Sequence, residues 1–332
     1  MRPSCNVLVS SAGRRVELLR SFRAALAGLD VDGKVLATDR SWFASAFHDA
    51  DLGVVVPDCL SPQFIPTMLE LCSAHGVGLV IPTIDTELPV LAAHRDEFAA
   101  IGTIVAVSGP RTIAVAEDKV ATGNWFADHQ IPTVEMAAAN DVVDGVVAWD
   151  FPAISKYRRG SASIGIALVQ DRRELLALPG LGERIVQSIA PGDEYTVDVL
   201  VSRSGDVVCA VPRKRLEVRA GEVSKSLTVR HRALIDLVTR LVTALPDAFG
   251  VLNIQCIVSG DEIRVIEINA RFGGGFPLSL QAGADFPRWL VEEHLGLPSS
   301  VDADGWVDDL VMLRYDAAVF VHASPDVLGD GS

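Results

Sequence analysis

The first third of the chain alternates short apolar runs with segments of helical periodicity, and this alternation limits the possible folds more than any other feature. Strands that are buried on both faces form continuous apolar runs, and their alternation with helices is typical of parallel βαβ units. The sequence therefore predicts a Rossmann-like domain over residues 1–111. The expected strands are residues 6–11, 34–39, 52–57 and 77–83, and the expected helices are residues 15–28 and 62–75.

The character of the sequence changes near residue 112. A helix is expected over 112–129, a break follows at Ile131–Pro132, and the later strands contain more glycine and charge. Residues 151–201 form a strand, a Gly/Ser loop, a second strand, a short helix and a third strand. We therefore place a domain boundary near 112 and expect an α/β domain followed by an α+β region.

Composition limits the partners and the compartment. The 332 residues are 49% apolar and carry a formal net charge of −14, without a dominant cluster of Lys and Arg, so a nucleic-acid partner is not expected. The five scattered cysteines form no metal-binding pattern and favour a reducing compartment. No signal peptide and no apolar run long enough to cross a membrane is present, so we expect a cytoplasmic protein without a membrane partner.

The most informative segment is the strand IEINAR. Side chains alternate along a strand, so Glu267, Asn269 and Arg271 project from one face and Ile266, Ile268 and Ala270 from the other. A three-residue loop over 260–262 would place Gln255 opposite Glu267. One carboxylate and two side-chain amides suit Mg²⁺, and Arg271 can bind an anion beside it. The alternative interpretation is an ordinary polar strand that faces water.

This segment resembles the C-terminal core of the ATP-grasp superfamily, which includes biotin carboxylase, carbamoyl-phosphate synthase and D-alanine–D-alanine ligase. The resemblance implies that Glu267 and Asn269 bind the metal and that Arg271 binds a phosphate or an intermediate. Gln255 stands at the position of the family's other metal ligand, which is more often acidic. The implied fold is a Rossmann-like domain (1–111), a helical linker with a small ATP-grasp lid (112–186), an ATP-grasp core (187–318) and a tail (319–332).

Three earlier segments resemble the nucleotide-binding motifs of the same family. Lys119, near the middle of the helix expected over 112–129, matches a lysine that reaches ATP phosphates. Lys156 follows an apolar strand and precedes a small-residue loop that resembles the family's phosphate-covering flap. Residues 185–200, IVQSIAPGDEYTVDVL, resemble the segment that binds adenine and ribose in this family. The implied ATP-binding residues are Lys119, Lys156, Gly160, Ser161, Ser163, Gln187, Ser188, Ile189 and Glu194.

The resemblance implies an ATP-dependent ligase that needs Mg²⁺, with Mn²⁺ as a substitute. A small-molecule carboxylate would form an acyl phosphate, an amine would displace phosphate to give an amide, and the products would include ADP and phosphate. Arg271, Arg213 and Arg215 are the expected catalytic residues. We also expect an amino-acid-like substrate from a biosynthetic reaction. The expected substrate-binding residues are Arg14, Asp85, Glu87, Lys225, Gly273 and Gly274.

Two alternatives are open at this stage, and the assembly could be a homodimer. A catalytically inactive ATP-grasp protein could sense nucleotides, although it would have no chemical reason to keep the complete set of charged residues. A NAD-dependent dehydrogenase is suggested by the Ser10–Arg15 loop after the first strand and by Asp39 at the end of the second. The glycine fingerprint of such enzymes is missing, however.

Overall fold

The computed structural model describes residues 2–160, 165–219 and 221–322, and the chain divides into two compact units. Unit 1 consists of residues 1–107, 285–301 and 314–332, and unit 2 of residues 108–284 and 302–313. The division follows Val107, and residues 285–301 belong to unit 1, whereas the linear division expected from the sequence assigned them to the core.

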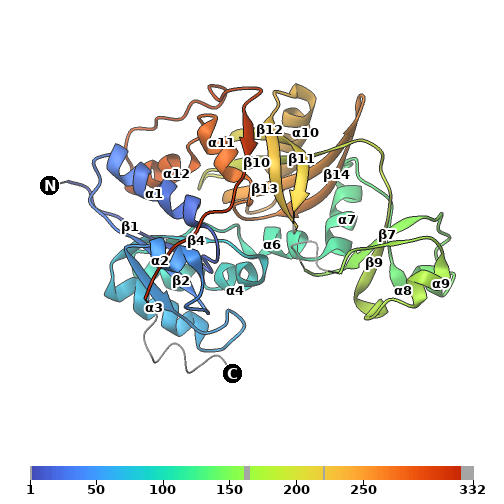
Figure 1. Cartoon of the computed structure of the whole chain (residues 1–332), viewed down its shortest axis with the longest axis horizontal. Helices are drawn as coiled ribbons and strands as arrows, with labels where there is room; N and C mark the ends of the chain where they lie inside the picture. The colour runs from blue at the N-terminus through green and yellow to red at the C-terminus, as the bar shows by residue number, and fades with distance from the viewer. Residues whose placement is uncertain (1, 161–164, 220, 323–332) are drawn as a thin grey trace. The chain divides into compact units, whose positions relative to one another are not determined.

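Unit 1 is built on a five-stranded parallel sheet in the order β3-β2-β1-β4-β5. Each apolar run predicted in the first third forms a strand at its predicted place (Figure 1). Helix α12 was not predicted, and it packs against α1 and β4. The strands are β1 (Asn6–Ser10), β2 (Val35–Asp39), β3 (Leu52–Val55), β4 (Val77–Pro82) and β5 (Ile104–Val105). The helices are α1 (Val16–Gly28), α2 (Ser45–Asp49), α3 (Phe64–Ala74), α4 (Leu88–Ala93), α5 (Arg95–Ala100) and α12 (Phe286–Leu295).

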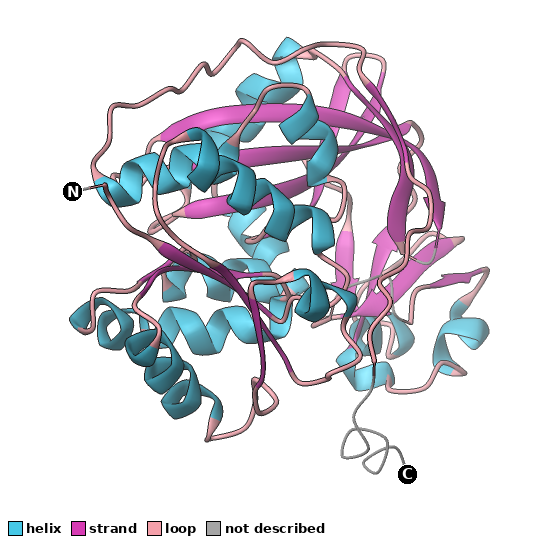
Figure 2. Cartoon of the chain, turned by 60° about the vertical axis from the view of Figure 1, so that its left-hand side comes forward, coloured by secondary structure: helices cyan, strands magenta, loops and turns pink. Residues whose placement is uncertain are grey.

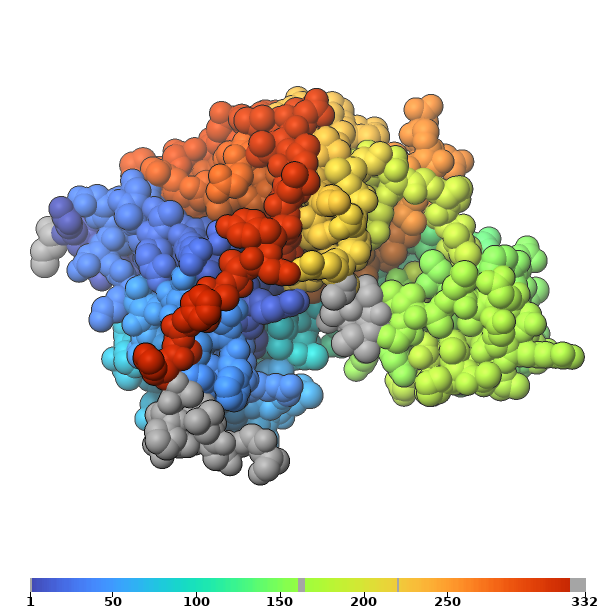
Figure 3. Space-filling model, viewed as in Figure 1, coloured from blue at the N-terminus to red at the C-terminus, as the bar shows by residue number. Residues whose placement is uncertain are grey.

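Residues 314–322 follow the last strand of the chain without regular secondary structure. They are clustered with unit 1, and Figure 3 shows them in red as a narrow strip along one face. Tyr315 and Phe320 are among their exposed side chains. No helix within the described residues has the length and apolar character needed to cross a membrane.

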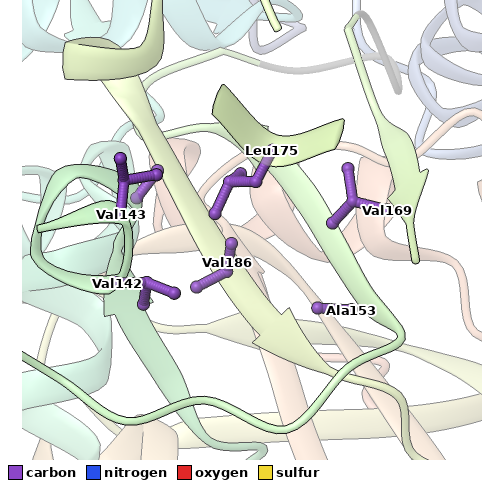
Figure 4. Close-up of a cluster of buried hydrophobic side chains, with 7 residues drawn as sticks. Val142, Val143, Ala153, Val169, Leu175 and Val186 are labelled. Atoms are coloured by element: carbon purple, nitrogen blue, oxygen red, sulfur yellow. The ribbon is translucent and has the colours of Figure 1, made fainter. Parts of the chain in front are cut away.

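Unit 2 contains a small four-stranded antiparallel sheet in the order β6-β9-β7-β8. Helices α8 and α9 pack their apolar side chains on this sheet, as Figure 4 shows for Val142, Val143 and Leu175 around Val186 of β9. The elements of this part are β6 (Met136–Ala138), α8 (Ala139–Val143), β7 (Ala153–Tyr157), β8 (Ala167–Val169), α9 (Arg172–Leu176) and β9 (Arg184–Ser188).

The helix predicted over 112–129 is two helices, α6 (Pro110–Glu117) and α7 (Lys119–Asp128). They separate at Asp118, whose backbone is extended and whose side chain caps the amides of Val120 and Ala121. Helix α6 begins two residues earlier than predicted because Asp247 accepts hydrogen bonds from the amides of Arg111 and Thr112. A distant carboxylate that caps a helix is invisible to local sequence patterns.

The rest of unit 2 is a six-stranded sheet in the order β14-β13-β10-β11-β12-β15, antiparallel throughout. Figure 2, in which strands are magenta, shows its longest strands running beside one another. Its elements are β10 (Asp193–Val201), β11 (Val207–Arg219), β12 (Glu222–Thr228), α10 (Arg232–Ala244), β13 (Gly250–Ser259), β14 (Glu262–Asn269), α11 (Phe276–Gln281) and β15 (Val311–Leu313).

The two faces of this sheet differ because side chains alternate along each strand. One face carries apolar residues such as Val197, Ile254 and Ile268, and α10 lies on this side, where the rings of His231 and Tyr195 meet. We call the other side the polar face. It carries Glu194, Thr196, Asp198, Arg213, Arg215, Ser226, Thr228, Asn253, Gln255, Glu267 and Asn269.

Candidate functional site

The predicted cross-strand pair of Gln255 and Glu267 is confirmed, although the loop that was expected to create it is wrong. The strands are joined by a two-residue turn at Gly260–Asp261, because Glu262 already pairs with Ser259. This turn alone would set Glu267 out of register with Gln255. An extra residue in β14, between the pairs Cys256–Val265 and Gln255–Glu267, shifts the register by one. A β-bulge therefore produces the pairing.

The metal-binding residues expected from the sequence occupy neighbouring positions on the polar face. Asn269 is paired with Asn253 and Glu267 with Gln255, so two amides and a carboxylate lie within two adjacent strands. Strand β14 ends at Asn269, and Arg271 lies in the following turn, where its guanidinium donates to the carbonyl of Phe272 at 3.1 Å. Arg271 also donates to Oδ1 of Asn269 at 3.5 Å.

Two buried lysines meet these residues. The ammonium of Lys119 donates to the carbonyl oxygen of Gly160 at 2.9 Å, and its Nζ lies 3.6 Å from Oε1 of Glu267. Lys156 is on β7 and, like Lys119, has 7% of its surface exposed. The pKa of Lys156 is lowered to about 8, mainly because the side chain is buried; Glu267 and Glu194 oppose this shift, and the charge of Lys119 adds to it. The two lysines and two carboxylates therefore act on one another.

The residues expected to bind adenine and ribose lie where β9 ends and β10 begins. Gln187 is buried, and its amide lies 3.9 Å from the sulfur of Met136, whereas Ile189 is exposed. The amide of Ser188 donates to the carbonyl of Glu135. Glu194 forms an ion pair with Arg215, which extends from the neighbouring strand β11. Ser161 and Ser163 lie outside the described residues.

Arg213 is buried in a different set of contacts. Its Nε and Nη2 donate to Asp198 at 2.7 and 3.0 Å, and both side chains have at most 1% of their surface exposed. Asp198 also accepts from Asn253 at 2.7 Å and from Ser279 at 2.6 Å. The structure therefore gives Arg213 a structural ion pair in the centre of the sheet, which the sequence did not reveal.

Three N–H groups on the polar face are buried and find no partner among the described residues. They belong to Nη1 of Arg213, Nε of Arg215 and Nδ2 of Asn269. Buried donors are normally paired, and leaving one unpaired costs about 1–3 kcal/mol. All three are donors, so the group that would satisfy them is an acceptor, and two of them belong to cationic side chains. The polar face is thus suited to an anion.

The two glycines that flank Gly274 in RFGGGF are explained by close packing within the chain. A Cβ on Gly273 would lie 2.4 Å from Nδ2 of Asn253, and one on Gly275 would lie 2.2 Å from Nη1 of Arg213. Gly273 and Gly274 are the two glycines predicted to bind substrate, and the packing of Gly273 on Asn253 accounts for that glycine without a ligand. Lys225 is exposed and forms a 2.7 Å ion pair with Glu217.

The substrate-binding residues expected in unit 1 have different environments. Arg14 is exposed and Asp85 is half-buried. Glu87 is fully buried and accepts from the hydroxyls of Ser10 and Ser11 and from the amides of Thr83 and Ile84. These four bonds give Glu87 a role in joining the ends of β1 and β4, and leave no exposed oxygen for a substrate ammonium group.

Asp39 does not resemble a ribose ligand of a dehydrogenase. One of its oxygens accepts from the amide of Gly13 at 2.9 Å and the other accepts from the amide of Ser41 at 2.9 Å. Its carboxylate thus holds two loops of unit 1 in place.

Sequence reasoning missed Asp118, Arg158, Asp198, Asn253 and Ser279. Asp198 offered a signal, since it is a charged residue within the apolar strand YTVDVLV, where burial requires a partner. Asp118 also offered one, because it directly precedes Lys119 at a position that suits a helix cap. Nothing local indicated that Arg158, Asn253 or Ser279 would be their partners.

The side-chain oxygens of Glu267 and its neighbours on the polar face could bind Mg²⁺ if nucleotide phosphates supply further ligands. Among the described residues, no group of three or more His, Cys, Asp or Glu side chains converges as a metal site. Mg²⁺ commonly uses one or two carboxylates and takes its other ligands from water and substrate phosphates. Glu267, Asn269 and Gln255 therefore fit a metal that arrives with a nucleotide.

Comparisons with known proteins show which families the chain resembles. Residues 7–106 match the family described as PylC-like, N-terminal domain, and residues 182–314 match ATP-grasp in the biosynthetic pathway with Ter operon. The chain is 24% identical over 241 residues to a D-alanine–D-alanine ligase of Lacticaseibacillus casei (strain BL23). That alignment covers 65% of this chain and 64% of the relative, so less than two thirds of the relative is spanned.

Solved structures share the fold. The biotin carboxylase domain of Hydrogenobacter thermophilus 2-oxoglutarate carboxylase, in complex with MgADP, ADP and bicarbonate, has a TM-score of 0.71 at 16% identity. The match covers 92% of this chain and 73% of that one. N5-carboxyaminoimidazole ribonucleotide synthetase from Thermus thermophilus has a TM-score of 0.68 at 21% identity, over 89% and 79% of the two chains. The predicted fold class is confirmed.

Proposed function

Because the chain belongs to the ATP-grasp superfamily, we propose that it is an ATP- and Mg²⁺-dependent ligase that joins a carboxylate to an amine. The observation that carries this proposal is that Lys119 and Lys156 lie near Glu267, on a polar face that also holds three buried donors without partners among the described residues. Two cations and unpaired N–H groups suit a polyphosphate, and one carboxylate with two amides suits the accompanying metal.

The proposed reaction has two steps. An oxygen of the substrate carboxylate attacks the γ-phosphorus of ATP, and ADP leaves with the bridging oxygen. The nitrogen of the amine then attacks the acyl carbon, the C–N bond forms, phosphate leaves, and the nitrogen loses a proton. Mn²⁺ could replace Mg²⁺, since both accept oxygen ligands.

The chain's own residues would act mainly by orientation and electrostatics. Lys119 and Lys156 would bind phosphate oxygens, and Glu267, Asn269 and Gln255 would hold Mg²⁺, which neutralises charge on the phosphates when bound. Arg271 would donate to the oxygen that becomes negative in the second step, a contribution commonly worth about 3 kcal/mol for one donor. Arg215 keeps Glu194 in place near the proposed ribose site.

We propose an amino acid or a similar zwitterion as one substrate. Arg14 would bind its carboxylate and Asp85 its ammonium group, since both lie in loops that follow strands of the parallel sheet, where α/β proteins bind ligands. Glu87 is excluded from this set by its burial. The substrates would be small molecules.

The decisive experiment measures ADP release with pairs of amino acids and other carboxylates, with mass spectrometry of the product. Once a pair is found, Glu267→Ala should abolish ADP formation while the protein stays folded. Glu262→Ala is the matched control, because Glu262 is on the same strand, is exposed and contacts Arg264. Retained Mg²⁺-dependent activity in Glu267→Ala would overturn the metal site.

A second measurement tests the phosphate site. In calorimetry, Lys156→Ala should weaken binding of MgADP at least tenfold, because a buried cation near the phosphates is lost. Lys214→Ala provides the control, since Lys214 pairs with Asp193 on the other side of the sheet. Equal affinities in the two variants would move the phosphate site elsewhere. ADP binding without turnover of any substrate pair would support an inactive nucleotide sensor.

A further inference from the structure

Asp118, at the junction of α6 and α7, contacts two segments of the chain at once. Its carboxylate caps α7 by accepting from the amides of Val120 at 3.0 Å and Ala121 at 3.4 Å. The same carboxylate accepts from Nε of Arg158, with 2.7 Å to Oδ1 and 2.8 Å to Oδ2. Arg158 directly follows β7, the strand that carries Lys156. Asp118 therefore joins the start of α7 to the end of β7.

Backbone contacts continue the same junction. The amide of Lys119 donates to the carbonyl of Arg158 at 3.1 Å, and the ammonium of Lys119 donates to the carbonyl of Gly160 at 2.9 Å. The amide of Arg158 donates to the carbonyl of Glu183 at 2.7 Å, just before β9. Two segments that are 40 residues apart in sequence are thus held side by side at several points.

The junction brings together two groups that repel one another. Lys119 and Lys156 each have 7% of their surface exposed, and the charge of Lys119 disfavours the charged form of Lys156. Glu267 and Glu194 offset part of this repulsion, and a polyanion between the two ammonium groups would offset more. The fold therefore needs contacts that fix the two lysines before the anion arrives.

Asp118 could cap α7 without an ion pair to Arg158. Asp171 caps α9 in the same way, by accepting from the amides of Arg173 at 2.7 Å and Glu174 at 2.9 Å, and these two amides satisfy the cap without an arginine side chain. The side chain of Arg158 is 46% exposed, and such partly exposed ion pairs contribute little to stability by themselves. Geometry rather than stability accounts for this pair.

We propose that Asp118 and Arg158 are positioning residues, and that their ion pair holds Lys119 and Lys156 at the separation that binds the phosphates of a nucleotide. The inference rests on the proposed ATP site and adds two residues to it. Neither side chain needs to touch the ligand. Asp118 sets the start of α7, where Lys119 is the first residue, and Arg158 sets the end of β7, two residues after Lys156.

The test compares Asp118→Asn and Arg158→Gln with two matched controls. Asparagine is as good a helix cap as aspartate, so Asp118→Asn keeps the cap and weakens only the pair with Arg158. Asp171→Asn makes the same chemical change at a cap of the neighbouring small sheet. Arg159→Gln removes an arginine whose Nη2 lies 3.6 Å from Asp118 and whose side chain is 64% exposed. Thermal melting checks that each variant is folded.

Calorimetry with MgADP should show affinities reduced roughly tenfold in Asp118→Asn and in Arg158→Gln, and the double variant should lose no more than the larger single loss. Both controls should stay within about twofold of the parent protein. In the protein without nucleotide, amide hydrogen exchange should become faster in peptides covering 118–123 and 156–160 only in the two test variants.

The outcomes separate the two proposals. Faster exchange with unchanged MgADP affinity would leave the pair a purely structural contact and overturn the inference. Unchanged exchange would also overturn it, because the pair would not hold the segments together. If the parent protein does not bind MgADP, the proposed function fails, and faster exchange in the test variants would show that the junction itself is real while its role in nucleotide binding is not.

Discussion

Among the described residues, one carboxylate in each unit has no exposed surface, and the two are stabilised differently. Asp198 in unit 2 accepts four hydrogen bonds, two of them from the guanidinium of Arg213. Glu87 in unit 1 also accepts four, from two hydroxyls and two backbone amides. Both carboxylates are fully hydrogen-bonded, but only Asp198 pairs with a positively charged side chain.

The two carboxylates therefore respond differently to pH and to loss of a partner. Burial raises the pKa of Glu87 even though its four hydrogen bonds work in the opposite direction, so folding makes this carboxylate easier to protonate. Asp198 forms an ion pair with Arg213. Removal of either side chain would leave the other as an unpaired buried charge. Unit 1 thus carries a pH-dependent junction between β1 and β4, whereas unit 2 carries a fixed ion pair within its polar face.

The largest expected effect follows from breaking the ion pair. Asp198→Ala leaves Arg213 buried without its partner, which should reduce the free energy of unfolding by about 3–5 kcal/mol. Urea denaturation measures the loss. Asp193→Ala on the same strand is the control, because Asp193 and its partner Lys214 are partly exposed and such pairs contribute about 1 kcal/mol or less.

The double variant Asp198→Ala/Arg213→Met sharpens this prediction. Removing both charges should restore part of the stability, since methionine fills much of the volume without leaving a buried ion. If Asp198→Ala costs no more than Asp193→Ala, the buried pair is not the feature that distinguishes the two units.

An intermediate effect is expected from crowding Arg213. In Gly275→Ala, the new methyl group would lie 2.2 Å from Nη1 of Arg213 and 2.7 Å from Cγ1 of Val223, so one of them must move. Overpacking of this kind commonly costs about 1–3 kcal/mol, here measured by thermal unfolding. The φ of Gly275 is −91°, which alanine adopts readily, so the cost would come from the contact.

Gly182→Ala is the matched control in the same unit, because its new methyl group would meet nothing closer than 3.6 Å. Equal stability of Gly275→Ala and Gly182→Ala would mean that residues 273–275 can shift at little cost, and that Gly275 does not pack tightly on Arg213.

The smallest effect, and the only one that depends on pH, is expected at Glu87. Its pKa is raised in the folded protein, so its unfolded form releases a proton first as pH rises above about 4.3. Stability from this group is therefore present at low pH and is lost as pH rises toward the folded pKa. Each unit by which the pKa is raised corresponds to about 1.4 kcal/mol.

Glu87→Gln removes this titration and keeps the shape of the side chain. Its amide group can donate to the hydroxyls of Ser10 and Ser11, and its oxygen can accept from the amides of Thr83 and Ile84. Urea unfolding gives the free energy of unfolding near pH 5 and near pH 8. The stability of the variant relative to the parent protein should be greater at the higher pH. A pH-independent difference would mean that Glu87 is ionised under both conditions.

Much of the fold was predictable because it depends on local patterns. The predicted strands of unit 1 are continuous apolar runs that are buried in a parallel sheet, so each was found within two residues of its boundary. The pairing of Gln255 with Glu267 was also predicted, although the expected three-residue loop is wrong and a bulge supplies the register. Helix α12 was missed although local signals were present, since Asp285 caps its start and Gly296 ends it; only its place in unit 1 depends on contacts with α1, near the opposite end of the chain.

The sequence alone determined the class of side chains at the candidate site. Glu267 and Asn269 are recognisable from strand alternation, which is a property of neighbouring residues, whereas Lys119 and Lys156 were predicted because their segments resemble ATP-grasp motifs. Tertiary structure decided which of the charged residues are free to bind a ligand. Arg213 and Glu87 look available in the sequence, but each is buried against partners from other strands and loops, and only folding brings those partners together.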